Sequence, residues 1–155
     1  MPDPVLGHNA LRVTDFGESL ATLSEFMITV MQTQGGVGLA ANQIGIAQDL
    51  FVYDPGDGRG PWAVANGRVT SMSGEKFAEE GCLSMHGWRF EIPRAIDIEW
   101  TGQDIKGNPC GGSASGLAAR IIQHETDHLR GRSLLNYVSK HDKLLVLGLV
   151  VPPSV

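Results

Sequence analysis

One pentapeptide, His-Glu-Thr-Asp-His at 124–128, constrains this chain more than any other stretch of its sequence. Side chains four residues apart on a helix project from the same face, so His124 and His128 can share one metal ion. Glu125 then lies beside any water molecule at that ion, where a carboxylate can act as a general base. The pattern therefore predicts a helix at this position and a hydrolytic metal site on it.

A hydrolytic site of this kind needs three protein ligands and one open position. Two protease arrangements lack the third ligand, because Leu134 stands where one class has a histidine and Asp142 is the only acidic residue after His128. Upstream, Cys82 is the best available thiolate and completes a set of one cysteine and two histidines. Cys110 lies in a glycine-rich loop and is expected to be incidental.

The composition is that of a globular chain with a single core. The 155 residues are 42% hydrophobic and 19% charged. Seventeen acidic and twelve basic side chains give a net charge of −5 without any basic run, so nucleic acid is not an expected partner. The N-terminal residues lack a secretion-signal pattern, and the longest apolar stretch, 144–151, is too short to span a membrane. We expect one domain over 1–155, located in the cytoplasm.

Local patterns predict most helices and strands. Helices are expected from a capping box at Asp15 and Glu18 up to Gly35, and from Ser113 or Ser115 up to Leu129. Strands are expected at 50–53 and 96–100, at 62–65 and 68–71 around an Asn-Gly hairpin turn, and a hairpin and loop over 102–115. The glycine- and alanine-rich segment 36–45 indicates that another group approaches its backbone closely. Periodicity does not separate helix from strand over 134–151.

Three segments resemble the signature motifs of the peptide deformylase family and occur in the family's order. They are Gly-Val-Gly-Leu-Ala-Ala-Asn-Gln at 36–43, Glu-Gly-Cys-Leu-Ser at 80–84 and Gln-His-Glu-Thr-Asp-His-Leu at 123–129. The similarity begins at Pro-Asp-Pro-Val-Leu, residues 2–6, and ends near Tyr137. It implies an α+β fold in which antiparallel or mixed sheets wrap a central helix that carries the histidine pair. It also implies removal of the formyl group from the N-terminal formyl-methionine of nascent polypeptides, with release of formate.

The resemblance implies a role for each residue near the metal. The cysteine and the two histidines would hold one divalent ion, natively Fe²⁺, with Zn²⁺, Ni²⁺ or Co²⁺ as substitutes. Glu125 would act as general base and then as general acid. The side-chain amide of Gln43 and the backbone N–H of Leu83 would stabilise the developing oxyanion.

The resemblance also implies a groove for the substrate. Residues expected to bind the peptide are Val37, Gly38, Arg89, Leu117 and Ile121. Arg94 is expected to pair with Glu80 and so to support the metal ligands. The expected partners are N-formylmethionyl peptides, including nascent chains at the ribosome, with no membrane, and the expected state is a monomer.

Three departures from the family pattern bear on substrate recognition. His86 stands where the family usually has proline, Asn66-Gly67 replaces a common Asn-Pro, and a short apolar tail replaces a charged C-terminal helix. A deformylase-like enzyme for another N-formylated substrate therefore stays open, as does a metalloprotease with the same histidine pattern. A binding protein with a structural metal and a hydrolase with Cys82 as nucleophile are further alternatives.

Overall fold

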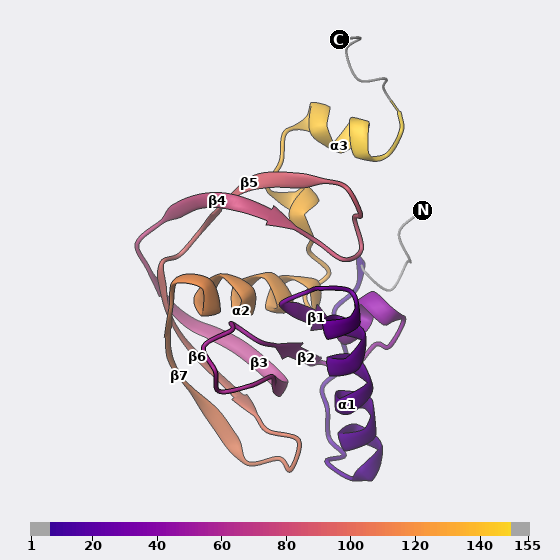
Figure 1. Ribbon diagram of the computed structural model, residues 1–155, viewed down its shortest axis with the longest axis vertical. Helices are drawn as coiled ribbons and strands as arrows, with labels where there is room; N and C mark the ends of the chain where they lie inside the picture. Colours follow the sequence, from indigo (N-terminus) through magenta and orange to yellow (C-terminus); the bar gives the residue numbers. More distant parts are fainter. Residues whose placement is uncertain (1–6, 150–155) are drawn as a thin grey trace.

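The computed structural model describes residues 7–149, which form two antiparallel sheets on either side of one helix (Figure 1). The five-stranded sheet has the order β1-β2-β3-β6-β7, and β4 and β5 form a separate two-stranded ribbon. The strands of the large sheet are β1 (Gly38–Ala40), β2 (Leu50–Tyr53), β3 (Trp62–Ser73), β6 (Asp97–Gln103) and β7 (Pro109–Ser115). The ribbon consists of β4 (Lys76–Gly81) and β5 (Arg89–Arg94).

The helices are α1 (Glu18–Thr33), α2 (Gly116–His128) and α3 (Lys140–Val146), with short 3₁₀ helices η2 (Ala41–Ile44) and η3 (Leu134–Asn136). Two of the helices, α1 and α2, pack on opposite faces of the large sheet. Figure 1 shows α2 in the middle of the molecule, between the large sheet and the ribbon, with α3 beyond β5. The expected α+β architecture around a central histidine-bearing helix is therefore confirmed.

The core has two apolar clusters, one on each face of the sheet. Strand β2 is buried along its whole length, and because successive side chains of a strand point to opposite faces, Leu50 and Val52 join one cluster and Phe51 and Tyr53 the other. The first cluster packs under α1 and the second under α2. Helix α2 is thus held against the sheet by its apolar residues while its histidines face the ribbon.

Several of the predicted elements are confirmed. Strand β2 has the expected bounds, α2 has Ser115 as its N-cap, and β6 and β7 form the expected hairpin. The capping box of α1 was wrong, since Gly17 is the N-cap and the Asp15 carboxylate accepts a hydrogen bond from the Gly17 N–H at 3.0 Å. The glycine- and alanine-rich segment forms β1 and η2, of three and four residues.

The predicted hairpin turn at Asn66-Gly67 is wrong, because β3 runs straight through it. The pairing of β3 with β6 shifts register between Ala65 and Arg68, which marks a β-bulge. Asn66 has a positive φ of 55°, and its side chain exchanges two hydrogen bonds of 2.9 Å with the backbone of Val13. Contacts with distant segments therefore turn a typical turn sequence into a bulge inside a strand.

The segment after α2 is helical where it is described. It forms η3 and α3, while residues 150 and 151 of the predicted apolar tail lie outside the described residues, as do residues 2–6. Across 7–149, none of the helices combines the length and apolar character needed to cross a membrane.

Candidate metal centre

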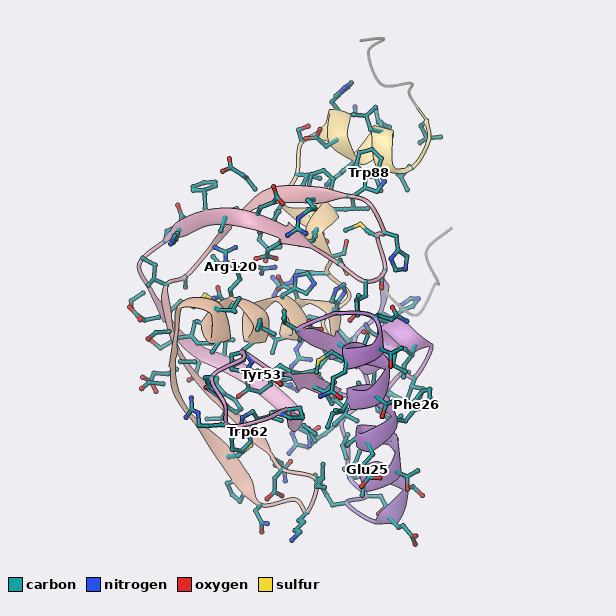
Figure 2. The ribbon with its side chains drawn as sticks, in the orientation of Figure 1. Glu25, Phe26, Tyr53, Trp62, Trp88 and Arg120 are labelled. Carbon is teal, nitrogen blue, oxygen red and sulfur yellow. The ribbon has the colours of Figure 1, made fainter. Side chains whose placement is uncertain are left out.

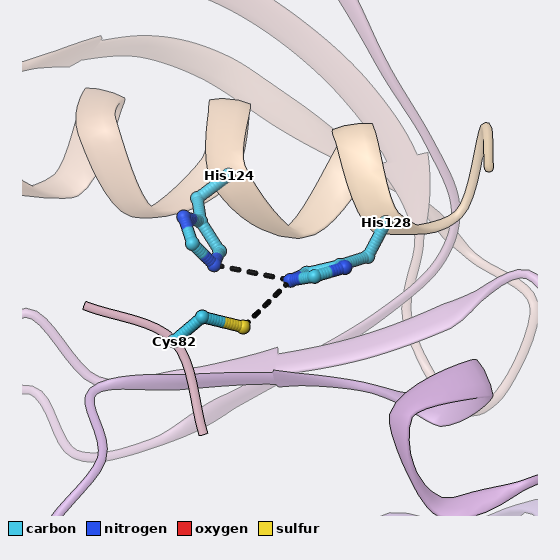
Figure 3. Close-up of side chains that lie close together, drawn as sticks. All are labelled: Cys82, His124 and His128. Atoms are coloured by element: carbon cyan, nitrogen blue, oxygen red, sulfur yellow. Dashed lines mark hydrogen bonds between the residues drawn. The ribbon is translucent and has the colours of Figure 1, made fainter. Parts of the chain in front are cut away.

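The structure brings Cys82, His124 and His128 together at the interface between the ribbon and α2 (Figure 3). Cys82 follows directly after β4, and the two histidines lie one turn apart on α2. The Nε2 atom of His128 lies 3.2 Å from the Cys82 sulfur and 3.1 Å from the Nε2 atom of His124. One atom from each residue can be chosen so that all three lie within 4.8 Å of one another.

The chemistry of these three donors fits a divalent metal ion. Bonds of about 2.0 to 2.3 Å in a tetrahedral site place ligand atoms roughly 3.3 to 3.7 Å apart, close to the observed separations. Two imidazole nitrogens and a sulfur that face one another are all electron-pair donors, and a shared cation satisfies them together. Three protein ligands leave a tetrahedral ion one open position, as hydrolytic sites require.

The glutamate of the second motif fixes the orientation of one histidine. Glu80 is buried, and its Oε2 atom lies 2.8 Å from Nδ1 of His124. Arg94 donates two further hydrogen bonds to this carboxylate, at 3.0 and 3.1 Å. Burial would raise the pKa of Glu80, but the hydrogen bonds from His124 and Arg94 outweigh it and lower the pKa to about 2. A permanently charged acceptor at Nδ1 directs the Nε2 atom of His124 towards the metal position.

Glu125 is the other carboxylate of the site, and its surroundings are very different. It is 3% exposed, and its Oε2 atom has no hydrogen-bond partner among the described residues. Burial raises its pKa to about 7, against the opposing influence of His124 and Arg94. A carboxylate with such a pKa can both accept and return a proton near neutral pH.

The first motif lies against Glu125 and Cys82. A methyl group at Gly38 would overlap an oxygen of Glu125 and lie 2.8 Å from a side-chain carbon of Ile121, so only glycine fits there. The close approach expected from the sequence is therefore present at this glycine. Gln43 is held by a 2.8 Å hydrogen bond from the Ala40 N–H to its Oε1 atom, and its amide donates to the Cys82 sulfur at 3.3 Å and to the Ser84 hydroxyl at 3.0 Å.

Comparisons with known proteins agree with this geometry. The family model for polypeptide deformylase matches residues 1–144 of the chain. The chain belongs to the polypeptide deformylase family. Peptide deformylase 1 of Corynebacterium efficiens is 42% identical over 154 residues, covering 96% of this chain and 89% of that protein.

Similarity extends to solved structures of deformylases. The crystal structure of a peptide deformylase from Legionella pneumophila superposes with a TM-score of 0.90 at 36% identity, covering 96% of this chain and 88% of that one. The peptide deformylase from Thermotoga maritima gives a TM-score of 0.85 at 42% identity, covering 88% of this chain and 92% of that one. Both the fold and the metal site of this chain are thus those of a deformylase.

A groove of about 510 Å³ opens over the metal site of this deformylase. Residues predicted from the sequence that line it are Val37, Gly38, Gln43, Cys82, Leu83, Arg89, Leu117, Ile121, His124 and Glu125. His128 lies behind them, 2% exposed. Val37 and Leu117 are about half exposed, at 49% and 53%, so they offer apolar surface to an entering side chain. Arg89 pairs with Glu79 across the ribbon at the rim of this groove.

Sequence reasoning missed the roles of four residues of the site, which are Arg120, Ser84, Asp127 and Tyr137. Arg120 donates a 2.6 Å hydrogen bond to Glu80, Ser84 holds the Gln43 amide, and Asp127 accepts hydrogen bonds from Arg94 at 2.5 Å and from the Tyr137 hydroxyl at 2.6 Å. Asp127 lies inside the pentapeptide, but its partner Arg94 is 33 residues away in sequence, so no local pattern indicates that pair. Arg120 shares the helix with the histidines, four residues before His124, which is the one signal that could have pointed to it.

Proposed function

We infer that this chain is a metal-dependent peptide deformylase, which removes the N-formyl group from nascent polypeptides and releases formate. The observation that carries this conclusion is the site itself, where one thiolate, two imidazoles and a buried carboxylate meet at the floor of an open groove. Family membership over 1–144 adds the substrate class.

We propose Fe²⁺ as the native ion, with Zn²⁺, Ni²⁺ or Co²⁺ as functional substitutes. Cys82, His124 and His128 would hold it, and a thiolate with two imidazoles suits several first-row ions. A divalent ion bound there supplies Lewis-acid chemistry, which lowers the pKa of water and stabilises negative charge on oxygen.

We propose that Glu125 carries the protons of the reaction. Its Oε2 atom, which has no hydrogen-bond partner in the described part of the chain, can take a proton from the attacking water and later deliver it to the amine that leaves. The Gln43 amide and the backbone N–H of Leu83 are proposed to donate to the oxygen of the formyl carbonyl as it gains charge. For this, one N–H of Gln43 exchanges the Ser84 hydroxyl for the substrate oxygen.

The groove suits a methionyl peptide. Apolar side chains of Val37, Leu117 and Ile121 are proposed to receive the unbranched methionine side chain, the backbone of Gly38 to pair with an extended peptide, and Arg89 to contact the peptide further along. We further propose that the chain acts as one catalytic domain over 1–155, as a monomer in the cytoplasm, on nascent chains at the ribosome.

A formate-release assay tests this function directly. Protein loaded with iron or nickel should release formate from formyl-Met-Ala-Ser and leave Met-Ala-Ser intact. Cleavage of an internal peptide bond without formate would instead favour a metalloprotease, and turnover that survives removal of the metal would favour Cys82 as nucleophile. Formate released only from formylated compounds other than peptides would assign the enzyme another N-formylated substrate.

A further inference from the structure

The three metal ligands come from two parts of the structure, helix α2 and the loop directly after β4. Cys82 lies in the loop that joins the two strands of the ribbon, whereas His124 and His128 belong to α2, which packs its apolar face on the large sheet. Between α2 and the ribbon, Asp127 accepts a hydrogen bond from Arg94, and His124 is hydrogen-bonded to Glu80. Hydrogen bonds between ribbon and helix therefore help to set the distance between the thiolate and the imidazoles.

Arg120 of α2 makes three hydrogen bonds to the ribbon. Its NH1 group donates to Oε1 of Glu80 at 2.6 Å and to the Ile92 carbonyl at 3.0 Å. Its NH2 group donates to the Lys76 carbonyl at 2.6 Å. Figure 2 shows Arg120 in the layer between α2 and β4. One side chain of the helix thus holds both strands of the ribbon and the carboxylate that orients His124.

The contacts of Arg120 are complementary to those of Arg94. Arg94 lies on β5 and reaches from the ribbon to Asp127 on α2, while Arg120 reaches from α2 to the ribbon. The Oε1 atom of Glu80 accepts one hydrogen bond from Arg94 and one from Arg120. Its Oε2 atom accepts a second hydrogen bond from Arg94 and contacts His124. The Arg120 side chain is only 13% exposed and that of Glu80 only 6%, so the charge-assisted hydrogen bond between them is largely shielded from water.

We propose that Arg120 is a positioning residue that fastens the Cys82-bearing ribbon to the histidine-bearing helix, so that the three ligands are assembled before a metal ion binds. The proposal rests on the metal site of the proposed deformylase but not on the identity of its substrate. A planar guanidinium can serve three acceptors in fixed directions, whereas a lysine ammonium at the end of a flexible stem cannot span them with the same geometry. The three hydrogen bonds to the ribbon therefore require arginine rather than positive charge alone.

Zinc release and thiol reactivity test this proposal without any turnover assay. All proteins carry Cys110→Ser, so that Cys82 is the only thiol. The zinc-loaded proteins are mixed with an excess of a chromogenic chelator, and the metal-free proteins with an aromatic disulfide reagent. Arg120→Met should release zinc about tenfold faster or more, as expected for loss of a group that orients metal ligands, and its Cys82 should react faster. Arg120→Lys should lie between Arg120→Met and the parent.

Arg132→Met is the matched control. Arg132 also pairs with a buried carboxylate of α2, donating to Asp127 at 3.0 Å, but it is 55% exposed, and within residues 7–149 it makes no hydrogen bond to β4 or β5. This variant should release zinc within about twofold of the parent rate. Unchanged zinc release and thiol reactivity in folded Arg120→Met would overturn the proposal, as would equal acceleration in Arg132→Met. If Arg120→Met does not fold, Arg120→Lys decides, and a parental release rate would overturn the proposal. Neither rate depends on turnover, so both would still test this proposal if the protein proved not to be a deformylase.

Discussion

Glu125 is buried, has a pKa near neutrality, and carries one oxygen without a hydrogen-bond partner among residues 7–149. If it moves protons during turnover, Glu125→Gln should keep the shape of the site but lower kcat by about 10² to 10⁴-fold, because an amide cannot accept the proton. Formate release and bound metal are measured on the same samples. Full activity with a normal metal content would rule out the general-base role of Glu125.

The lack of a side chain at Gly38 leaves room for the Glu125 carboxylate. Gly38→Ala would force the new Cβ into Glu125 and Ile121, so Glu125 must shift. A displacement of about 1 Å can cost roughly 10²-fold in rate, and we expect a loss of this size in kcat for formate release. Gly7→Ala is the control, because a Cβ there meets nothing within 4 Å. Equal rates for Gly38→Ala and Gly7→Ala would contradict the packing argument.

Strand β3 depends on a single side chain at its bulge. Asn66 bonds the backbone of Val13 on both its N–H and C=O sides and donates to Gln103 at 2.7 Å. Asn66→Ala would leave these buried groups without partners. It would also put alanine at a positive φ, which asparagine tolerates better. The free energy of unfolding should therefore fall by about 3 kcal/mol. Urea denaturation measures it.

Asn66→Gly separates the two contributions to this loss. Glycine tolerates the positive φ but cannot make the hydrogen bonds, so this variant should lie between the parent and Asn66→Ala. If both variants were as stable as the parent, the hydrogen bonds to Val13 would not hold the bulge in place.

The same elements show what the sequence can and cannot predict. Strand β2 and helix α2 could be predicted from patterns of neighbouring residues. The metal-binding role of the histidine pair could be predicted too, because the two residues lie one helical turn apart. The bulge at Asn66 was missed because its partners lie 53 and 37 residues away in sequence. Arg120 was missed for a related reason, since two of its three acceptors are main-chain carbonyls, which every residue carries.

At the scale of the whole molecule, the metal site joins parts of the chain that are far apart in sequence. Its ligands lie at position 82 on the ribbon and at positions 124 and 128 on α2, which is itself packed on the large sheet. An ion that binds the folded chain and not the unfolded one stabilises the fold by about 2.7 kcal/mol when its free concentration is 100 times Kd. Metal binding should therefore be visible in global unfolding as well as in catalysis.

Removing and restoring the metal makes this link measurable. For a chain of this size, stripping the ion should lower the midpoint of thermal unfolding on the order of 5 to 10 °C, and reloading with Zn²⁺ or Ni²⁺ should restore it. Scanning calorimetry of the parent and of Cys82→Ala, with and without metal, provides the comparison. Cys82→Ala should lose most of the metal-dependent increase because the ribbon then contributes no ligand. An equal increase in both proteins would mean that the ion does not bridge ribbon and helix through the Cys82 thiolate.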